Sequence, residues 1–166
     1  MLTFIHYAHY VLSMTRKASI GDKAPRFTVE DEEGNKHALP GKGITVLYFY
    51  PKDDTPGCTK QACSFKEAHQ ELIKENVSVF GINADSKESH TKFKQKYDLP
   101  FTLLCDEDKE VAKSYGVTEQ KEMYGNKYLG INRTTFIIKD QTIQHVLTDI
   151  DVESHAETIL KRVREL

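Results

Sequence analysis

The chain has 166 residues, of which 39% are hydrophobic and 29% are charged, a composition typical of one soluble globular domain. Its 23 Lys and Arg residues nearly balance its 25 Asp and Glu residues, and the net charge of −2 argues against binding to nucleic acid or to an anionic membrane. Three cysteines are too few, and odd in number, for the disulfide framework of a secreted protein, so a cytoplasmic protein is expected.

The first 18 residues are interpreted as an N-terminal extension. They begin with apolar and aromatic residues, but two histidines interrupt this run and no Lys or Arg precedes it, which argues against a secretory signal. Met14 would make a natural start, so residues 1–13 are either a poorly ordered extension or an artefact of start-site choice. No stretch reaches the ~20 apolar residues of a membrane span. Residues 19–166 are expected to form one domain.

The domain is predicted to begin with strands. Residues 27–29 and 36–39 flank a turn at Glu33–Asn35 and indicate a short hairpin. Residues 44–50 form a nearly continuous β-branched and aromatic run, which is typical of a strand buried on both faces. A helix is predicted over about residues 58–75, because apolar side chains recur there at helical spacing.

Strands and helices alternate in the rest of the chain. Phe93 and Tyr97 are expected on the inner face of an otherwise solvated helix. Strands are predicted at residues 77–83 and 101–105, and helices at residues 87–97 and, capped by the acids 106–108, through residue 115. A hairpin is predicted at residues 134–138 and 143–148. The last predicted element is an amphipathic helix with Val152, Ala156, Ile159 and Val163 on one stripe. This order predicts an α/β domain with a mixed central sheet flanked by helices and an N-terminal β-hairpin.

The most informative stretch runs from Pro51 to Cys63. A buried strand leads into a loop bounded by Pro and Gly, and the loop delivers Cys58 to the start of a helix. The first turn of a helix presents unpaired N–H groups and the positive end of the dipole, which favour a thiolate over a thiol. Cys58 is therefore a candidate nucleophile, although a cysteine is also often a small buried hydrophobic residue. Thr55 can aim its hydroxyl into the same pocket.

The spacing Pro51-x3-Thr55-x2-Cys58 resembles the active-site signature of the peroxiredoxins. The longer string Thr-Pro-Gly-Cys-Thr-x-Gln-Ala-Cys is similar to the bacterioferritin-comigratory, or PrxQ, subfamily. The segment Phe-Thr-Leu-Leu-Cys-Asp resembles another part of this subfamily, with Cys105 where a serine is usual. The resemblance covers roughly residues 19 to 165, and it implies a thioredoxin-like fold.

The resemblance implies a thiol peroxidase that reduces hydrogen peroxide and organic hydroperoxides through a sulfenic acid at Cys58. The Thr55 hydroxyl, the Arg133 guanidinium and the Cys58 N–H would stabilise charge on the departing oxygen. Arg133 would also stabilise the thiolate. Pro51 would shield the pocket, and Gln61 would support the arginine by a hydrogen bond. Without the resemblance, Arg133 is interpreted as an exposed surface arginine and Thr55 as a turn residue.

The resemblance also implies that Cys63 resolves the sulfenic acid as an intramolecular disulfide, because part of the subfamily carries a second cysteine at this spacing. Five residues of helix separate the two Cα atoms by roughly 8–9 Å, whereas a disulfide requires about 4.4–6.8 Å. The first turns of the helix must therefore unwind. The alternative for Cys63 is packing beside Phe65, and Cys105 is expected to pack without a catalytic role.

Thioredoxin, or a glutaredoxin-like protein, is the reductant that the resemblance implies, and a monomer is expected, with a dimer as the alternative. No metal or other cofactor is expected, since the cysteines and histidines show no ligand spacing. The main alternative function is a thioredoxin-like disulfide oxidoreductase without peroxidase activity, but such a protein would use Cys-x-x-Cys. A chaperone-like or signalling module is a further hypothesis, and no interaction tail or heptad pattern supports it.

Overall fold

The computed structural model describes residues 16–166, so the expectations for residues 1–13 lie outside the described residues. Ala18 belongs to the packed domain, one residue before the predicted start at residue 19: its side chain is buried and its backbone N–H donates to the Tyr115 carbonyl over 3.1 Å. No helix within residues 16–166 is both long enough and apolar enough to cross a membrane.

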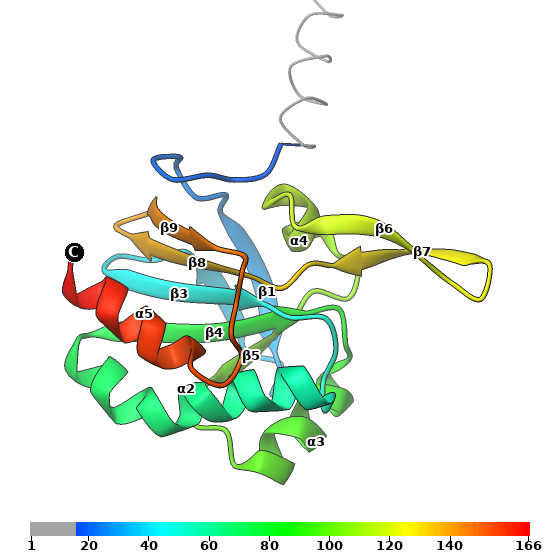
Figure 1. The fold of residues 1–166 in the computed structure, drawn as a ribbon, viewed down its shortest axis with the longest axis horizontal. Coiled ribbons are helices and arrows are strands. Elements are labelled where there is room, and N and C mark those ends of the chain that lie inside the picture. Colours follow the sequence, from blue (N-terminus) through cyan, green and yellow to red (C-terminus); the bar gives the residue numbers. More distant parts are fainter. Residues whose placement is uncertain (1–15) are drawn as a thin grey trace, which may run out of the picture.

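A seven-stranded sheet lies at the centre of the described residues, in the order β2-β1-β5-β4-β3-β8-β9 (Figure 1). Its strands are β1 (Phe27–Asp31), β2 (Lys36–Leu39), β3 (Ile44–Phe49), β4 (Val77–Asn83), β5 (Thr102–Cys105), β8 (Thr134–Lys139) and β9 (Thr142–Leu147). Strands β3, β4 and β5 are parallel to one another, whereas β1 and β8 join them antiparallel. The predicted mixed sheet and its N-terminal hairpin are confirmed.

Strand β3 is buried on both faces, as its unbroken apolar run predicts. Val46, Tyr48 and Tyr50 pack into the core on one side of the sheet. Leu47 and Phe49 pack into a second core on the other side. Successive side chains of a strand point to opposite faces, so this one strand contributes to both cores and its carboxyl end is held firmly in place.

Helices lie on both faces of the sheet (Figure 1). Helices α2 (Pro56–Lys74) and α5 (His155–Arg164) cover one face, and Phe93 of α3 (Lys87–Tyr97) joins the core beneath them. The short helix α4 (Glu110–Ser114) contributes Val111 and Ala112 to the core of the other face. The flanking helices expected from the sequence are therefore confirmed.

Two helix starts differ from the sequence prediction. Helix α2 begins at Pro56 rather than at residue 58, because a proline in the first turn gives up no intrahelical hydrogen bond. Helix α5 begins at His155, so Val152, predicted on its inner stripe, precedes the helix. The predicted capping of α4 is confirmed, because the Asp106 carboxylate accepts hydrogen bonds from two backbone N–H groups of that helix.

The structure contains a hairpin that the sequence analysis missed. Strands β6 (Thr118–Met123) and β7 (Asn126–Ile131) pair around Tyr124 and Gly125, whose φ values are +51° and +79°. Two positive φ values are the signature of a type I′ hairpin turn. The hairpin projects from the domain (Figure 1), and most of its side chains are exposed, so it lacks the apolar alternation that marks a strand. Strand β7 leads directly to Arg133.

Candidate functional site

Cys58 lies in the first turn of α2, and its side chain is only 2% exposed. The loop after β3 ends at Thr55, which occupies the N-cap position. The Thr55 side chain does not cap the helix; its hydroxyl donates instead to the Lys52 carbonyl over 2.9 Å. The N–H groups around Cys58 therefore lack the side-chain oxygen that an N-cap threonine commonly supplies.

Arg133 reaches Cys58 from the segment between β7 and β8. Its Nη2 donates to the Cys58 Sγ over 3.4 Å, and its Nη1 donates to the Gln61 side-chain oxygen. Gln61 is fully buried one turn further along α2. The structure thus brings together Cys58, Arg133 and Gln61, while their parts in catalysis stay predictions.

Gly57 gives the guanidinium room to approach the helix. A Cβ atom placed on residue 57 would lie 3.2 Å from the Arg133 Nη2, which is closer than an ordinary van der Waals contact. Because Nη2 is the atom that contacts the sulfur, a side chain at residue 57 would press on the arginine where it meets Cys58.

Cys63 lies five residues after Cys58 within the same uninterrupted helix, and its side chain is partly buried. Cys58, Cys63 and Cys105 are all free thiols. An intact helix keeps residues at this spacing too far apart for a disulfide, so this structure corresponds to a reduced, fully folded state of the pair.

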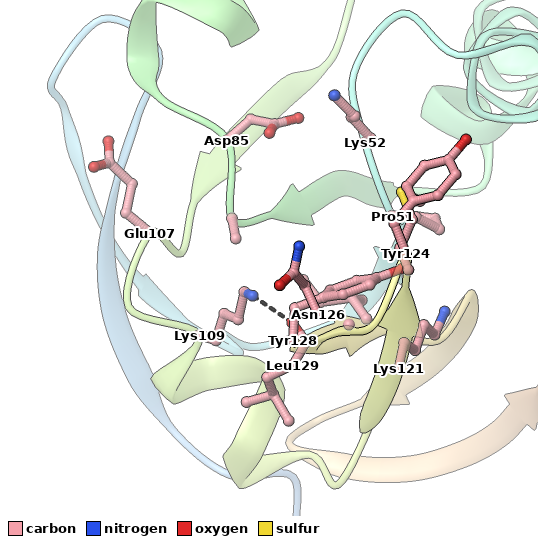
Figure 2. A pocket seen from close by; sticks show the side chains of 14 residues that line it. Pro51, Lys52, Asp85, Glu107, Lys109, Lys121, Tyr124, Asn126, Tyr128 and Leu129 are labelled. Atoms are coloured by element: carbon pink, nitrogen blue, oxygen red, sulfur yellow. Dashed lines mark hydrogen bonds between the residues drawn. The ribbon is translucent and has the colours of Figure 1, made fainter.

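A pocket of about 830 Å³ flanks the candidate site on the side of the β6–β7 hairpin. Figure 2 shows Pro51 and Lys52 on one side of it, Tyr128 of the hairpin on another, and Lys109 donating to the Leu129 carbonyl. Thr55, Cys58 and Arg133 do not line this pocket. Pro51 is exposed and, with Lys52, is the part of the cysteine loop that lines this pocket.

A buried polar network holds the loop before α2, and the sequence analysis missed it. The Asp53 carboxylate accepts hydrogen bonds from the Tyr50 hydroxyl (2.6 Å), the Ser89 hydroxyl (2.8 Å), the Asn83 amide (3.2 Å) and the His90 Nδ1 (2.6 Å). Asp53 is 7% exposed. A buried carboxylate is tolerated only when it is paired and hydrogen-bonded, and here four donors satisfy it.

His90 is the cation of this network. Its Nε2 faces the Leu104 carbonyl (2.9 Å) while its Nδ1 faces Asp53, so both ring nitrogens face acceptors and both carry a hydrogen. Burial lowers the pKa of His90, but the hydrogen bond to Asp53 and the charge of that carboxylate outweigh burial and raise the pKa to about 10. The sequence signal was available, because His90 shares the helical spacing of Phe93 and Tyr97.

His155 lies near Arg133 and is held neutral. Its side chain is 2% exposed, and its Nε2 lies 2.8 Å from the Thr135 hydroxyl. Burial, with a smaller contribution from the charge of Arg133, lowers the pKa of His155 to about 4. The imidazole is therefore uncharged at neutral pH and adds no second cation beside Arg133.

Comparison with known proteins gives consistent matches. The AhpC/TSA family matches residues 20–146. The putative peroxiredoxin bcp of Coxiella burnetii is 47% identical over 148 residues, which cover 87% of this chain and 97% of the relative. Peroxiredoxin Bcp of Bacillus subtilis is 38% identical over 151 residues, covering 89% and 96%. The solved structure of a cysteine-to-serine mutant of Xylella fastidiosa PrxQ matches with a TM-score of 0.83 and 29% identity over 90% of this chain and 98% of that one, which confirms the expected thioredoxin-like fold.

His155 predicts a loss of stability in mild acid. Between pH 6.5 and about 4 the unfolded chain takes up a proton on this histidine and the folded chain does not, so the free energy of unfolding falls as the pH falls. The variant His155→Gln keeps a donor near Thr135 but cannot titrate, and it should lose up to roughly 3 kcal/mol of this pH dependence. Urea unfolding at several pH values gives the free energy of unfolding of both proteins. If this free energy changed equally with pH in the wild type and in His155→Gln, His155 would not be the group that titrates.

Proposed function

The chain belongs to the peroxiredoxins, the thiol peroxidases of the AhpC/TSA family, and on that premise we propose that Cys58 is the nucleophile that reduces hydroperoxides. The observation that carries the proposal is the contact of 3.4 Å between the Arg133 guanidinium and the Cys58 sulfur in the first turn of α2. A cation and a helix N-terminus both stabilise a thiolate, which is the reactive form of cysteine.

In the first step the Cys58 thiolate attacks the terminal oxygen of the hydroperoxide. A sulfur–oxygen bond forms, the oxygen–oxygen bond breaks, and the departing alkoxide takes a proton to leave as an alcohol, or as water from hydrogen peroxide. Sulfur is oxidised to a sulfenic acid and the peroxide is reduced by two electrons. Arg133 stabilises the negative charge that develops on the two peroxide oxygens.

For Thr55 we infer a part that differs from the donor role implied by the resemblance. Its single hydroxyl hydrogen is directed to the Lys52 carbonyl, so the oxygen presents its lone pairs to the space beside the helix. We therefore propose that Thr55 accepts a hydrogen bond from the O–H of the peroxide and orients it for attack. The donors to the reacting oxygens are then Arg133 and the Cys58 N–H.

The second step is assigned to Cys63. Its thiol attacks the sulfenic sulfur of Cys58, water leaves, and a disulfide joins the two residues. Because both residues lie on one helix, the first turns of α2 must unwind before the sulfurs meet. An external dithiol, for which we propose thioredoxin or a glutaredoxin-like protein, then reduces the disulfide by two electrons. We also propose that the protein acts as a monomer in the cytoplasm, a reducing compartment that returns the disulfide to free thiols after each cycle.

The defining experiment follows hydrogen peroxide consumption coupled to thioredoxin and thioredoxin reductase. The wild type should consume peroxide, and Cys58→Ser should lose turnover while its circular dichroism spectrum is unchanged, because no other nucleophile replaces the sulfur. A wild-type chain that reduces protein disulfides but leaves peroxide intact would instead be a thioredoxin-like oxidoreductase. Normal turnover by Cys58→Ser would refute the role of that cysteine.

Arg133 should matter for the first step. Arg133→Ala should slow oxidation of Cys58 by two to three orders of magnitude, as expected for loss of one strong donor to a developing charge. Arg133→Lys keeps the charge, but an ammonium group cannot contact Gln61 and Cys58 together as the planar guanidinium does. Its oxidation rate should therefore lie between those of the wild type and Arg133→Ala. Stopped-flow measurement of the first oxidation gives these rates. An Arg133→Ala rate within a factor of two of the wild type would exclude the role.

Cys63 should decide the fate of the sulfenic acid. One equivalent of peroxide should give a Cys58–Cys63 disulfide in the wild type, with faster amide exchange over residues of about 57–66. In Cys63→Ser the sulfenic acid should persist, react with dimedone and oxidise further to the sulfinic acid. Peptide mass spectrometry detects each product. A disulfide between Cys58 and Cys105, or a protected helix around a formed Cys58–Cys63 bond, would contradict this assignment.

A further inference from the structure

The loop that carries Pro51 and Thr55 is fixed to α3 by a buried ion pair. The Asp53 carboxylate and the His90 imidazolium lie 2.6 Å apart, and their residues are 7% and 0% exposed. The second ring nitrogen of His90 donates to the Leu104 carbonyl of β5, so the imidazole connects the loop to the sheet. Neither group acts in the chemistry proposed above.

The backbone of the loop is held at the same point. The Asp53 N–H donates to the Asp85 carboxylate over 2.8 Å, and the Asn83 side-chain amide donates to both Asp53 (3.2 Å) and Asp85 (3.0 Å). Asn83 is fully buried at the end of β4. Asp53 is therefore restrained through its main chain as well as its side chain.

Further contacts tie the neighbouring segments to the end of α3. Asp54, with a φ of +54°, accepts hydrogen bonds from Lys96 (2.8 Å) and from the Tyr97 hydroxyl (2.7 Å). In α2, the Lys66 Nζ donates to the Tyr97 carbonyl over 2.9 Å. These contacts are exposed and individually weak. The buried pair is the stronger attachment, and the segment of α2 between the attachments contains Cys58 and Cys63.

We propose that His90 is a positioning residue for Cys58: through Asp53 it fixes the loop before α2, and so favours the folded first turn in which Cys58 contacts Arg133. The inference rests on the proposed function, since it concerns the balance between the folded state that reacts with peroxide and the unwound state that forms the disulfide. Weakening the attachment should shift this balance towards the unwound state. The two chemical steps should then change in opposite directions.

Two variants of His90 distinguish the hydrogen bond of Nδ1 to Asp53 from the hydrogen bond of Nε2 to the Leu104 carbonyl. The amide nitrogen of Gln reaches the place of Nε2 and that of Asn the place of Nδ1, so His90→Gln loses the bond to Asp53 and His90→Asn keeps a donor to it. In stopped-flow measurements, His90→Gln should oxidise about tenfold more slowly with peroxide and close the disulfide at least as fast as the wild type. His90→Asn should recover part of the lost oxidation rate. The sulfinic product should be rarer in His90→Gln, because faster closure protects the sulfenic acid.

A milder substitution and a matched control test the proposal even if the His90 variants do not fold. Ser89→Ala removes one donor to Asp53 and should shift both rates in the same directions by a smaller factor, whereas Ser114→Ala removes a hydroxyl bonded within α4 and should change neither rate. Equal slowing of both steps in the His90 and Ser89 variants would show a general structural role and overturn the proposal. Unchanged rates in well-folded variants would overturn it as well. A wild type that neither consumes peroxide nor forms the disulfide would refute the proposed function itself, which is a separate outcome.

Discussion

The pairing of β3 with β8 is the constraint on which the candidate site depends. Phe49, the last residue of β3, lies opposite Thr134, the first residue of β8. The chain therefore leaves β3 for the cysteine loop beside the point where Arg133 enters β8. A slip of one residue in this register would turn the buried side chains of β8 to the opposite face, so packing on both faces fixes the position of the arginine.

The electrostatics of the site depend on which buried charges are paired with an opposite charge. Asp53 and His90 neutralise each other, and His155 is kept uncharged. The hydrogen-bonding partners of the Arg133 guanidinium are a neutral amide oxygen and the Cys58 sulfur. A partly buried cation without a carboxylate partner is costly. The Cys58 thiolate that we propose as the nucleophile would be the counter-charge of this arginine.

The sequence predicts the parts of the fold in which burial leaves an unbroken apolar run or apolar residues at regular spacing. Strand β3 was recognised from its unbroken apolar run and helix α2 from apolar residues at helical spacing, because both elements pack into the cores. The β6–β7 hairpin was missed because its stability lies in turn geometry at Tyr124 and Gly125 rather than in buried side chains. Apolar residues recur at regular spacing where an element packs against a core, and few side chains of this hairpin do so.

The candidate site was only partly accessible from the chain itself. The position of Cys58 after a buried strand and a Pro/Gly loop is a local feature, so it could be recognised directly. Arg133 contacts Cys58 across 75 residues of sequence, and only the family resemblance placed it there. The ion pair of Asp53 with His90 spans 37 residues and belongs to no motif that we recognised. Long-range polar contacts of this kind depend on strand order, which no local pattern encodes.

Gly57 shows how an uncharged residue can govern the charge around a sulfur atom. The backbone of this residue is not in the left-handed region, so glycine is not required there for its conformational freedom. What matters is volume, because a methyl group would occupy space that the guanidinium needs beside Cys58. A larger residue there would require the guanidinium, which ends a flexible side chain, to shift by a few tenths of an ångström. The size of residue 57 is therefore coupled to the separation between the guanidinium and the Cys58 sulfur, although residue 57 carries no charge itself.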